Sequence, residues 1–482
     1  MGRLDALYGR LPVWAQHGAV TTYGLYWYWL RFGPGYNQYL KDYTDREGFS
    51  SEEWRAWQQR RLRGLLQSAV TSVPYYQRMW TKGERAAALA GRLEELPRLE
   101  KDPIRAEPEA FLRRDIHPWT RVASHTSGST GTPIVSINTV QEIRNSLALR
   151  EVRSARWAGV SFQMPRATFS GRLVEPDPES KGPFYRFNLV ERQAYLSAFH
   201  LRADTASFYV DALRKHRIQW LTGYAVSYYV LAKFILEQGL KVPPLKAVIT
   251  TSEKLLPEMR QVMQVAYGCR VYEEYSTVEN VPFASECQRG RLHVSPDVAI
   301  VEILRPDGTP CQSDEMGEVV TTALVREYQP LIRYRVGDYA MWDGTPCPCG
   351  RAMPVLREVV GRIEDMVIGP DGRQMVRLDH IFRGQIHVRE GQIIQEALNR
   401  IRVKVVSTNG FGSADIRAII HRVQQRLGSR VEVIVEPVNQ ISRTPAGKFQ
   451  AVVSLLREQV APEAKRMGIS PPRLQSTPRR TT

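Results

Sequence analysis

Four short motifs contain residue types that bind phosphate, metal ions or nucleotides. The first, residues 126–133, reads Thr-Ser-Gly-Ser-Thr-Gly-Thr-Pro. Glycines allow backbone N–H groups to approach a phosphate, and Ser and Thr hydroxyls add donors without bulk. The segment is not the usual P-loop, because no Gly-Lys-Ser/Thr follows it. Phosphate binding and a flexible Ser/Gly turn are both open interpretations of this motif.

The second and third motifs each end in a carboxylate. They are Tyr275-Ser276-Thr277-Val278-Glu279 and Tyr334-Arg335-Val336-Gly337-Asp338, and a further carboxylate, Glu253, lies upstream of both. Ligands of open α/β sheets bind beyond the carboxyl ends of the strands. We therefore expect Glu253, Tyr275 and Glu279 to share one edge of a sheet. An aromatic ring and two carboxylates there could hold a base and a metal–phosphate group, and solvated loops are the alternative.

The fourth motif, Ser442-Arg443-Thr444-Pro445-Ala446-Gly447-Lys448, is a glycine-containing loop that ends in a cation. Separately, Cys287, His293, Cys347 and Cys349 form Cys-x₅-His and Cys-x-Cys pairs. Three thiols and one imidazole are the closed, four-ligand set of a structural Zn²⁺ site. The alternative is a set of reduced cysteines in a tight turn beside a surface histidine. The total of five cysteines is odd, which is typical of a reducing compartment.

The elements that position these motifs indicate an α/β fold. Residues 121–138 read as strand, loop and strand, and residues 247–275 as a parallel β-α-β unit whose helix ends at Gly268. Ser50 and Glu53 have capping-box spacing at the start of a helix. Short strands and a helix within residues 367–458 predict a small α/β domain. The Pro-, Ser- and Arg-rich residues 459–482 predict a basic, disordered tail.

The composition narrows the class of protein. The chain has 482 residues, with 66 Lys and Arg against 50 Asp and Glu, a net charge of +16. That charge favours anionic partners such as nucleotides, coenzyme A, nucleic acid or an anionic membrane. No zinc-finger or RNA-recognition motif is present in the sequence, so we do not expect nucleic acid to be a partner. The aromatic-rich residues 11–40 are too short and interrupted to span a bilayer. They fit a segment packed on the main domain or one lying at a membrane interface. We expect a cytoplasmic protein, with peripheral contact to the inner membrane surface as an option.

Taken in order, the four motifs resemble those of the adenylate-forming superfamily of acyl- and aryl-CoA ligases. The closest resemblance is to the phenylacetate–CoA ligase group and its capsular-polysaccharide-associated members, through Cys347-Pro348-Cys349-Gly350-Arg351 and Gly361-Arg362-Ile363-Glu364-Asp365 as well. The resemblance covers residues 10–458. It implies a large multi-sheet N-terminal adenylation domain over residues 1–363, including a helical segment over residues 1–80, and a small mobile C-terminal α/β domain over residues 364–458.

The resemblance also implies a reaction: ATP and Mg²⁺ activate a carboxylic acid to an acyl-adenylate, and a nucleophile then displaces AMP. Glu279 would hold Mg²⁺, Lys448 would bridge the α-phosphate and the substrate carboxylate, and Glu364 would mark the hinge. Nucleotide-binding roles fall on the phosphate loop, the sheet edge and the ribose contacts: Thr126, Ser127, Gly128, Ser129, Thr130, Gly131, Glu253, Tyr275, Ser276, Asp338 and Arg362.

Departures from the family pattern in two motifs and one open choice remain. Thr132 of the phosphate loop stands where many relatives carry Lys. In the motif that ends in Glu279, Ser276 stands for the usual Gly, and Val278 stands where relatives carry a hydroxyl residue that contacts the α-phosphate. The acceptor is coenzyme A by this interpretation, with a glycan or amine acceptor, or a non-catalytic scaffold in polysaccharide synthesis, as alternatives. Aromatics around residues 160–230 suit an aryl or fatty acid, and core packing explains them equally well: Phe184, Tyr185, Tyr224, Tyr228 and Tyr229.

Overall fold

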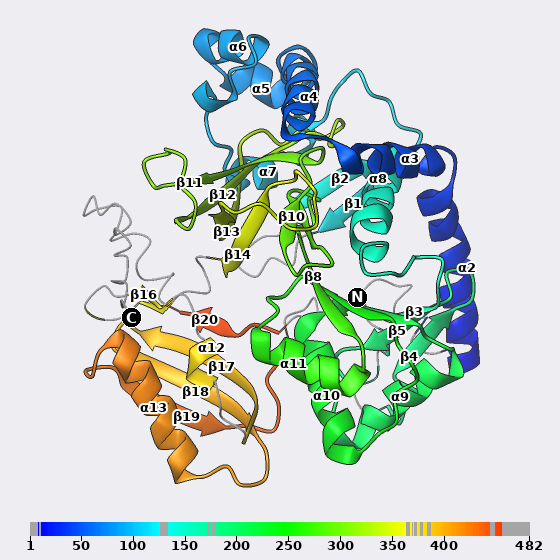
Figure 1. The fold of residues 1–482 in the computed structure, drawn as a ribbon, viewed down its shortest axis with the longest axis vertical. Coiled ribbons are helices and arrows are strands. Elements are labelled where there is room, and N and C mark those ends of the chain that lie inside the picture. Colours follow the sequence, from blue (N-terminus) through cyan, green and yellow to red (C-terminus); the bar gives the residue numbers. More distant parts are fainter. Residues whose placement is uncertain are drawn as a thin grey trace. The chain divides into compact units, whose positions relative to one another are not determined.

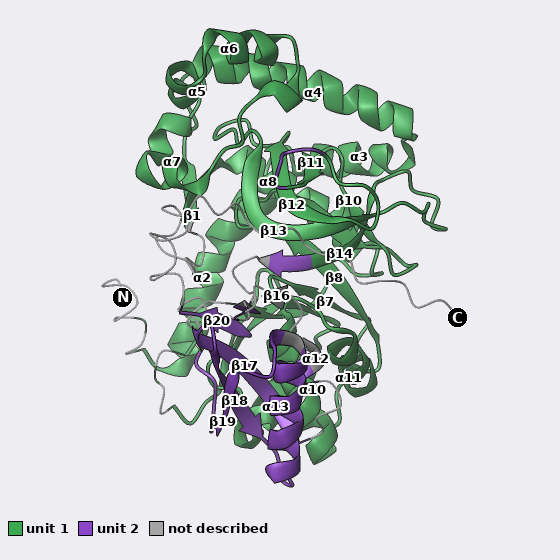
Figure 2. Ribbon diagram, turned by 90° about the vertical axis from the view of Figure 1, so that its left-hand side faces the viewer, with its two compact units in different colours: residues 1–305, 310–359, 443–449 green, residues 306–309, 360–442, 450–482 purple. Residues whose placement is uncertain are grey.

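A computed structural model of the chain describes residues 8, 11–125, 134–170, 174–175, 177, 180–362, 367–368, 370, 374–375, 379–382, 387–443 and 449–455. The chain divides into two compact units (Figure 2). Unit 1 contains residues 1–305, 310–359 and 443–449, and unit 2 contains residues 306–309, 360–442 and 450–482. The domain boundary predicted after residue 363 lies outside the described residues, as does the predicted tail.

Strands of unit 1 form one long mixed sheet, and the predicted α/β class is confirmed. Within the described part of the chain the sheet has 12 strands in the order β11-β12-β13-β14-β10-β9-β8-β7-β6-β3-β5-β4 (Figure 1). β5, β3, β6, β7 and β8 pair in parallel, and β9, β10 and β14 continue the sheet in antiparallel pairing. The bounds are β3 Arg166–Ser170, β4 Tyr185–Asn188, β5 Gln193–Ser197, β6 Trp220–Tyr224, β7 Ala247–Thr251, β8 Arg270–Ser276, β9 Phe283–Glu286, β10 Leu292–Val294, β11 Ala299–Leu304, β12 Met316–Ala323, β13 Tyr334–Asp343 and β14 Val355–Arg362.

Helices of unit 1 gather into an N-terminal group and a group around the parallel strands. The first comprises α2 Val13–Phe32, α3 Tyr36–Asp45, α4 Ser51–Ser72, α5 Pro74–Met79, α6 Lys82–Leu89, α7 Lys101–Ala106 and α8 Val140–Arg150, with short turns η1 Arg46–Gly48, η2 Leu93–Glu95, η3 Pro108–Phe111 and η4 Glu151–Ala155. The second comprises η5 Ala203–Thr205, α9 Ala206–Lys215, α10 Ala225–Gln238 and α11 Pro257–Tyr267. A hairpin of β1 Arg121–His125 and β2 Val135–Thr139 flanks the predicted phosphate loop, residues 126–133, which lie outside the described residues.

Local sequence signals account for several of these boundaries. The Ser50 hydroxyl accepts the Glu53 N–H at 3.2 Å, and the Glu53 carboxylate accepts the Ser50 N–H at 2.7 Å, so the predicted capping box at α4 is confirmed. β7 and β8 pair in parallel around α11, as predicted. Gly268 ends that helix with φ +63°, a left-handed backbone that favours glycine.

Packing divides unit 1 between two main apolar clusters. One lies among α4–α7 and the antiparallel strands, and it buries Leu66, Tyr76 and Phe111. The other lies among the parallel strands and α9–α11, and it buries Phe169, Leu213 and Met263. Rigid strands held from both sides provide fixed positions for side chains at their ends.

Unit 2 is a small α/β domain, as the sequence predicted for residues 367–458. Its four-stranded sheet has the order β19-β18-β17-β20, and α13 packs on β18 and β17 through Ile419 and Val423. The bounds are β15 Val367–Ile368, β16 Gln374–Met375, α12 Asp379–Phe382, β17 Val388–Ala397, β18 Arg400–Ser407, α13 Ser413–Leu427, β19 Glu432–Pro437 and β20 Val452–Ser454.

The aromatic N-terminal segment forms α2 and α3. Tyr36 and Tyr43 are buried against α8, whereas Trp14 is 77% exposed and Tyr26 and Trp29 are about half exposed. Part of this segment therefore packs on the domain, as one sequence interpretation expected, and another part presents aromatic rings; contact with a membrane stays a prediction. None of the described helices has both the length and the apolar character that crossing a membrane requires.

Candidate functional site

Two of the predicted nucleotide-binding residues meet at the end of β8. Tyr275 is the next-to-last residue of β8, and its hydroxyl donates to Asp338 Oδ2 of β13 at 2.7 Å. Asp338 is only 9% exposed. Gly337, just before it, has φ +86°, and a Cβ there would lie 2.9 Å from Lys101 Nζ. A glycine at this position therefore leaves room for a cation beside the Asp338 backbone.

The predicted metal ligand, Glu279, lies in the loop that follows β8 and is 5% exposed. Its Oε1 accepts a hydrogen bond of 2.8 Å from the hydroxyl of Tyr334, the first residue of β13. Tyr334 and Asp338 are four residues apart on β13, and the pairing of β13 with β12 shifts register between them, at the left-handed Gly337. β13 thus supplies one partner to Glu279 and one to Tyr275.

Arg326 ties this loop to the strand that follows the predicted phosphate loop. Its guanidinium donates to the Glu279 carbonyl at 2.9 Å and to Ser136 Oγ and Asn138 Oδ1 of β2, each at 2.9 Å. Arg326 is 1% exposed, and burial lowers its pKa from the ordinary value while the Glu142 and Glu279 carboxylates oppose the shift. Neither Arg326 nor the bond from Tyr334 was predicted from the sequence.

Glu253 lies just beyond the carboxyl end of β7, as predicted, and its carboxylate accepts two backbone N–H groups. Oε2 accepts from Val226 at 2.8 Å, and Oε1 accepts from Phe449 at 2.9 Å. Phe449 packs against the apolar cluster of the parallel strands, with the Arg443 guanidinium 4.9 Å from its ring centroid. Residues 443–449 accordingly cluster with unit 1.

Other predicted site residues divide into those that the structure describes in part and those that it does not. Ser276 ends β8, Val278 is 37% exposed beside Glu279, and Arg362 is the last residue of β14. Thr126, Ser127, Gly128, Ser129, Thr130 and Gly131 lie outside the described residues, as do Thr132, Glu364 and Lys448.

The aromatic residues suggested for an acid pocket are mostly core residues. Phe184, Tyr185, Tyr224 and Tyr228 are buried in the cluster of the parallel strands, and Tyr229 packs against it. The Tyr228 hydroxyl donates to the carbonyls of Ala167 and Thr222. Of these residues, Tyr224 ends β6 at the same strand edge as Glu253.

The four predicted zinc ligands are brought together. The ligand atoms of Cys287, His293, Cys347 and Cys349 all lie within 4.8 Å of one another. Three of the residues are buried, and Cys349 is partly buried. A set of this kind can hold one metal ion.

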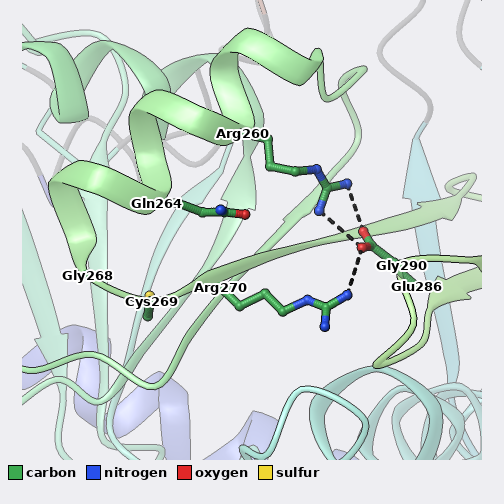
Figure 3. A pocket seen from close by; sticks show the side chains of 7 residues that line it. All are labelled: Arg260, Gln264, Gly268, Cys269, Arg270, Glu286 and Gly290. Carbon is green, nitrogen blue, oxygen red and sulfur yellow. Dashed lines mark hydrogen bonds and ion pairs between the residues drawn. The ribbon is translucent and has the colours of Figure 1, made fainter.

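A polar surface pocket lies at the opposite end of β8. Figure 3 shows Arg260 and Arg270 both directed at Glu286, with Gln264 and Cys269 nearby. Arg260 makes two hydrogen bonds to the Glu286 carboxylate, of 3.1 and 2.8 Å, so the nearby charges are largely paired. Arg270 begins β8 and Tyr275 lies five residues on, about 17 Å along the strand. This pocket is therefore separate from the candidate site.

Comparison with known proteins places this geometry in a class. The fold matches that of 2-hydroxyisobutyryl-CoA ligase in its postadenylation state in complex with R3-HIB-AMP, with a TM-score of 0.66 and 20% identity over 88% of this chain and 94% of that one. The chain therefore has the two-domain fold of the acyl- and aryl-CoA ligases in the adenylate-forming superfamily.

Two curated proteins and one family model show which sequences the chain is similar to. Protein CapK of Staphylococcus aureus is 24% identical over 372 residues, which cover 76% of this chain and 81% of that protein. A phenylacetate–coenzyme A ligase of Thermus thermophilus is 24% identical over 456 residues, which cover 85% of this chain and 98% of the enzyme. Residues 367–455 match the family model of the CapK C-terminal domain. The predicted resemblance to the phenylacetate–CoA ligase group and its capsule-associated members is confirmed, and the relatives include phenylacetate–coenzyme A ligases.

Proposed function

We propose that this protein is an AMP-forming ligase that activates a carboxylic acid with ATP and transfers the acyl group to coenzyme A. The observation that supports it most is the pairing of Tyr275 with Asp338, residues 63 positions apart, next to the buried carboxylate of Glu279. An aromatic ring, a carboxylate for ribose hydroxyls and a carboxylate for a divalent cation are the groups that a metal–nucleotide needs.

Each residue has a distinct task in this proposal. The Tyr275 ring stacks on adenine, and the Asp338 carboxylate accepts hydrogen bonds from the ribose hydroxyls. Glu279 holds Mg²⁺, a hard cation that prefers oxygen ligands and that neutralises phosphate charge when bound. The loop of residues 126–131 donates to the terminal phosphates, and Arg362 reaches the sugar. The basic chain, with a net charge of +16, favours approach of ATP and coenzyme A, which are both polyanions.

The reaction has two steps. In the first, a carboxylate oxygen of the acid attacks the α-phosphorus, the bond between that phosphorus and the bridging oxygen breaks, and pyrophosphate leaves. In the second, the thiolate sulfur of coenzyme A attacks the acyl carbon and AMP leaves. Negative charge gathers at the α-phosphate during the first step, so a fixed cation there lowers the barrier. We assign that cation to Lys448.

The contacts of Phe449 support this assignment. Phe449 follows Lys448 directly in the sequence, and its N–H is held by the Glu253 carboxylate at the carboxyl end of β7. Glu253 in this proposal anchors the Lys448 segment for adenylation and contributes to the nucleotide site through that segment. The mobile role of residues 364–458 and the hinge at Glu364 are part of the same proposal, since the cation serves only the first step.

The experiment is an acid panel. Purified protein is incubated with ATP, Mg²⁺ and pooled aryl and fatty acids, and AMP and pyrophosphate are measured with and without coenzyme A. Acid-dependent AMP release that coenzyme A accelerates supports the proposal. Asp338→Ala is the inactive control. The comparisons give no support to a glycan or amine acceptor or to a scaffold role. Acid-dependent adenylate that coenzyme A leaves unchanged would nevertheless favour the other acceptors, and absence of adenylate with every acid would favour the scaffold and implicate Val278.

Peripheral membrane contact through α2 is a further element of the proposal. This helix contains no acidic residue and a single Arg, and it exposes Trp14, Tyr23, Leu25, Tyr26 and Trp29. Trp and Tyr rings favour the headgroup region of a bilayer. Because the chain is strongly basic, we propose an anionic lipid surface as the partner of this helix.

A further inference from the structure

We propose that Cys287, His293, Cys347 and Cys349 bind one structural Zn²⁺ that fastens one end of the sheet on which the ligase site is built. The two pairs come from distant segments. Cys287 directly follows β9 and His293 is the middle residue of β10, whereas Cys347 and Cys349 lie in the loop between β13 and β14. The metal would therefore join the β9–β10 hairpin to the β13–β14 hairpin.

Two distances between the ligand atoms are close to those of a tetrahedral site. With Zn–S bonds of about 2.3 Å and a Zn–N bond of about 2.05 Å, tetrahedral angles place two sulfurs about 3.8 Å apart and a sulfur and nitrogen about 3.6 Å apart. Cys287 Sγ and Cys347 Sγ are 3.7 Å apart, and Cys349 Sγ is 3.4 Å from His293 Nε2. The sulfur–sulfur distance is far longer than a disulfide bond of about 2.05 Å, and all of these cysteines are free thiols.

Groups around the cluster orient its ligands. His293 Nδ1 is 3.2 Å from the Met353 carbonyl, which directs Nε2 to the thiols, and this is the usual outer partner of a ligating imidazole. The Arg289 N–H donates to Cys287 Sγ at 3.3 Å, a contact that stabilises a thiolate. His293 is fully buried, and the ring of Trp157 packs against it edge-on with centroids 5.9 Å apart.

Both hairpin loops are also held in place from outside. Arg270, at the start of β8, donates to the carbonyl of Gln288, and Arg291 donates to the carbonyl of Thr345 at 2.9 Å. Arg351 pairs with Glu47 at 3.1 Å and lies over Trp157. A site so braced has four protein ligands and no open position, which fits a structural metal and excludes a substrate-binding one.

The position of the cluster defines what the metal does. β13 runs from Tyr334 and Asp338 at the candidate site to Asp343 near Cys347, and β14 returns from Val355 to Arg362. His293 pairs with Ser285 of β9, and Ser285 pairs with Glu274 of β8, so the metal would lie about 10 Å from β8 and, with four protein ligands, would not contact a nucleotide on Tyr275. It would contribute instead to stability, by fastening the far end of the hairpin whose near end supplies Tyr334 and Asp338.

The first test is metal content, which does not depend on the proposed ligase activity. Protein purified without chelators from zinc-supplemented cells should contain about one equivalent of zinc, as should Cys269→Ser, which changes a thiol outside the set. Cys347→Ser should lose most of the zinc, and Cys349→His, which keeps four ligands, should retain it. The conservative variant keeps the test informative if Cys347→Ser fails to fold.

The second test separates structure from chemistry. Removing zinc with a strong chelator under reducing conditions should lower the thermal unfolding midpoint by several degrees, and re-adding zinc should restore it. The rate of adenylation per folded molecule should change less than twofold. The proposal is overturned if reduced wild-type protein contains less than a tenth of an equivalent and takes up none on titration. Equal zinc content in wild type and Cys347→Ser would overturn it as well.

Discussion

Tyr334→Phe tests whether β13 positions the predicted metal ligand. The substitution removes a hydroxyl from a side chain that is 1% exposed and keeps its ring, so packing is preserved. What is lost is the 2.8 Å hydrogen bond to Glu279 Oε1, which is itself buried. A hydrogen bond to a charged group contributes about 1.5–3 kcal/mol, so losing it corresponds to a factor of about 10 to 150.

Part of that loss should appear in the dependence on Mg²⁺. If Glu279 binds the cation only when Tyr334 orients its carboxylate, Tyr334→Phe should raise the Mg²⁺ concentration for half-maximal ATP–pyrophosphate exchange about 10-fold or more. The KM for the acid should change little, because the acid is not a partner of Glu279 in this proposal. The assay is exchange measured across a Mg²⁺ titration at saturating ATP and acid.

Tyr267→Phe is the matched control. Its hydroxyl donates at 2.7 Å to the backbone carbonyl of Tyr228, and the residue is 3% exposed. The same atom is deleted, but the partner is a neutral carbonyl on α10. We expect a loss of about 1 kcal/mol in the free energy of unfolding and an unchanged Mg²⁺ titration. If Tyr334→Phe behaves like this control, Tyr334 is a packing residue and the metal role of Glu279 loses its structural support.

Three other experiments, on catalysis, membrane binding and stability, have defined outcomes. Lys448→Ala should suppress acid-dependent pyrophosphate exchange by about a thousandfold, roughly 4 kcal/mol, and should still transfer the acyl group from preformed acyl-adenylate at near the wild-type rate. Glu364→Pro should keep the exchange and lose the transfer. Intact exchange in Lys448→Ala would show that its assigned role is wrong. Wild-type protein should co-sediment with anionic vesicles, and less of it should do so at high salt. The double variant Trp14→Ala/Tyr26→Ala should bind several-fold less, whereas the control Val265→Ala, at an exposed position of α11, should bind as wild type does. Equal sedimentation of the double variant and the wild type would assign the binding to the basic surface alone. Burial raises the pKa of Glu273 to about 7, with Arg260 opposing the shift and Glu286 adding to it. The carboxyl therefore lowers the free energy of unfolding as the pH rises from the ordinary pKa of a glutamate to about 7. Glu273→Gln should therefore raise the thermal midpoint more at pH 8 than at pH 5, and a gain independent of pH would contradict this assignment.

Structural features that depend on residues close together in the sequence could be predicted from it. The capping box at Ser50 and Glu53 and the helix end at Gly268 need only local hydrogen bonds and a left-handed backbone. The β-α-β unit follows from one alternation of apolar strand and helix. The Cys-x₅-His and Cys-x-Cys pairs are also local, since each pair spans a single turn or hairpin. The structure contains these local features because the tertiary contacts around them are compatible with the local conformations.

Features that depend on which strands are neighbours could not be predicted. The Tyr334–Glu279 bond joins residues 55 positions apart, and the contact between Glu253 and the Phe449 N–H spans 196 positions. Arg326 reaches β2 across about 190 residues. No periodicity in the sequence specifies such pairs, because they follow from strand order and from where the chain returns to the sheet. A signal did exist for Tyr334, because it begins the five-residue motif that ends in Asp338.

Strand order and register also relate the proposed metal cluster to the proposed nucleotide site. Tyr275, Tyr334 and Asp338 lie at one end of β8 and β13, and Arg270 and the cysteine loops lie at the other. The cluster nevertheless lies about 10 Å from β8, because His293 pairs with Ser285, which in turn pairs with Glu274 next to Tyr275. In our proposal the metal has four protein ligands and no open position, so it would hold the strands together without taking part in the reaction. Its loss should therefore lower the thermal unfolding midpoint and leave the rate of adenylation per folded molecule nearly unchanged.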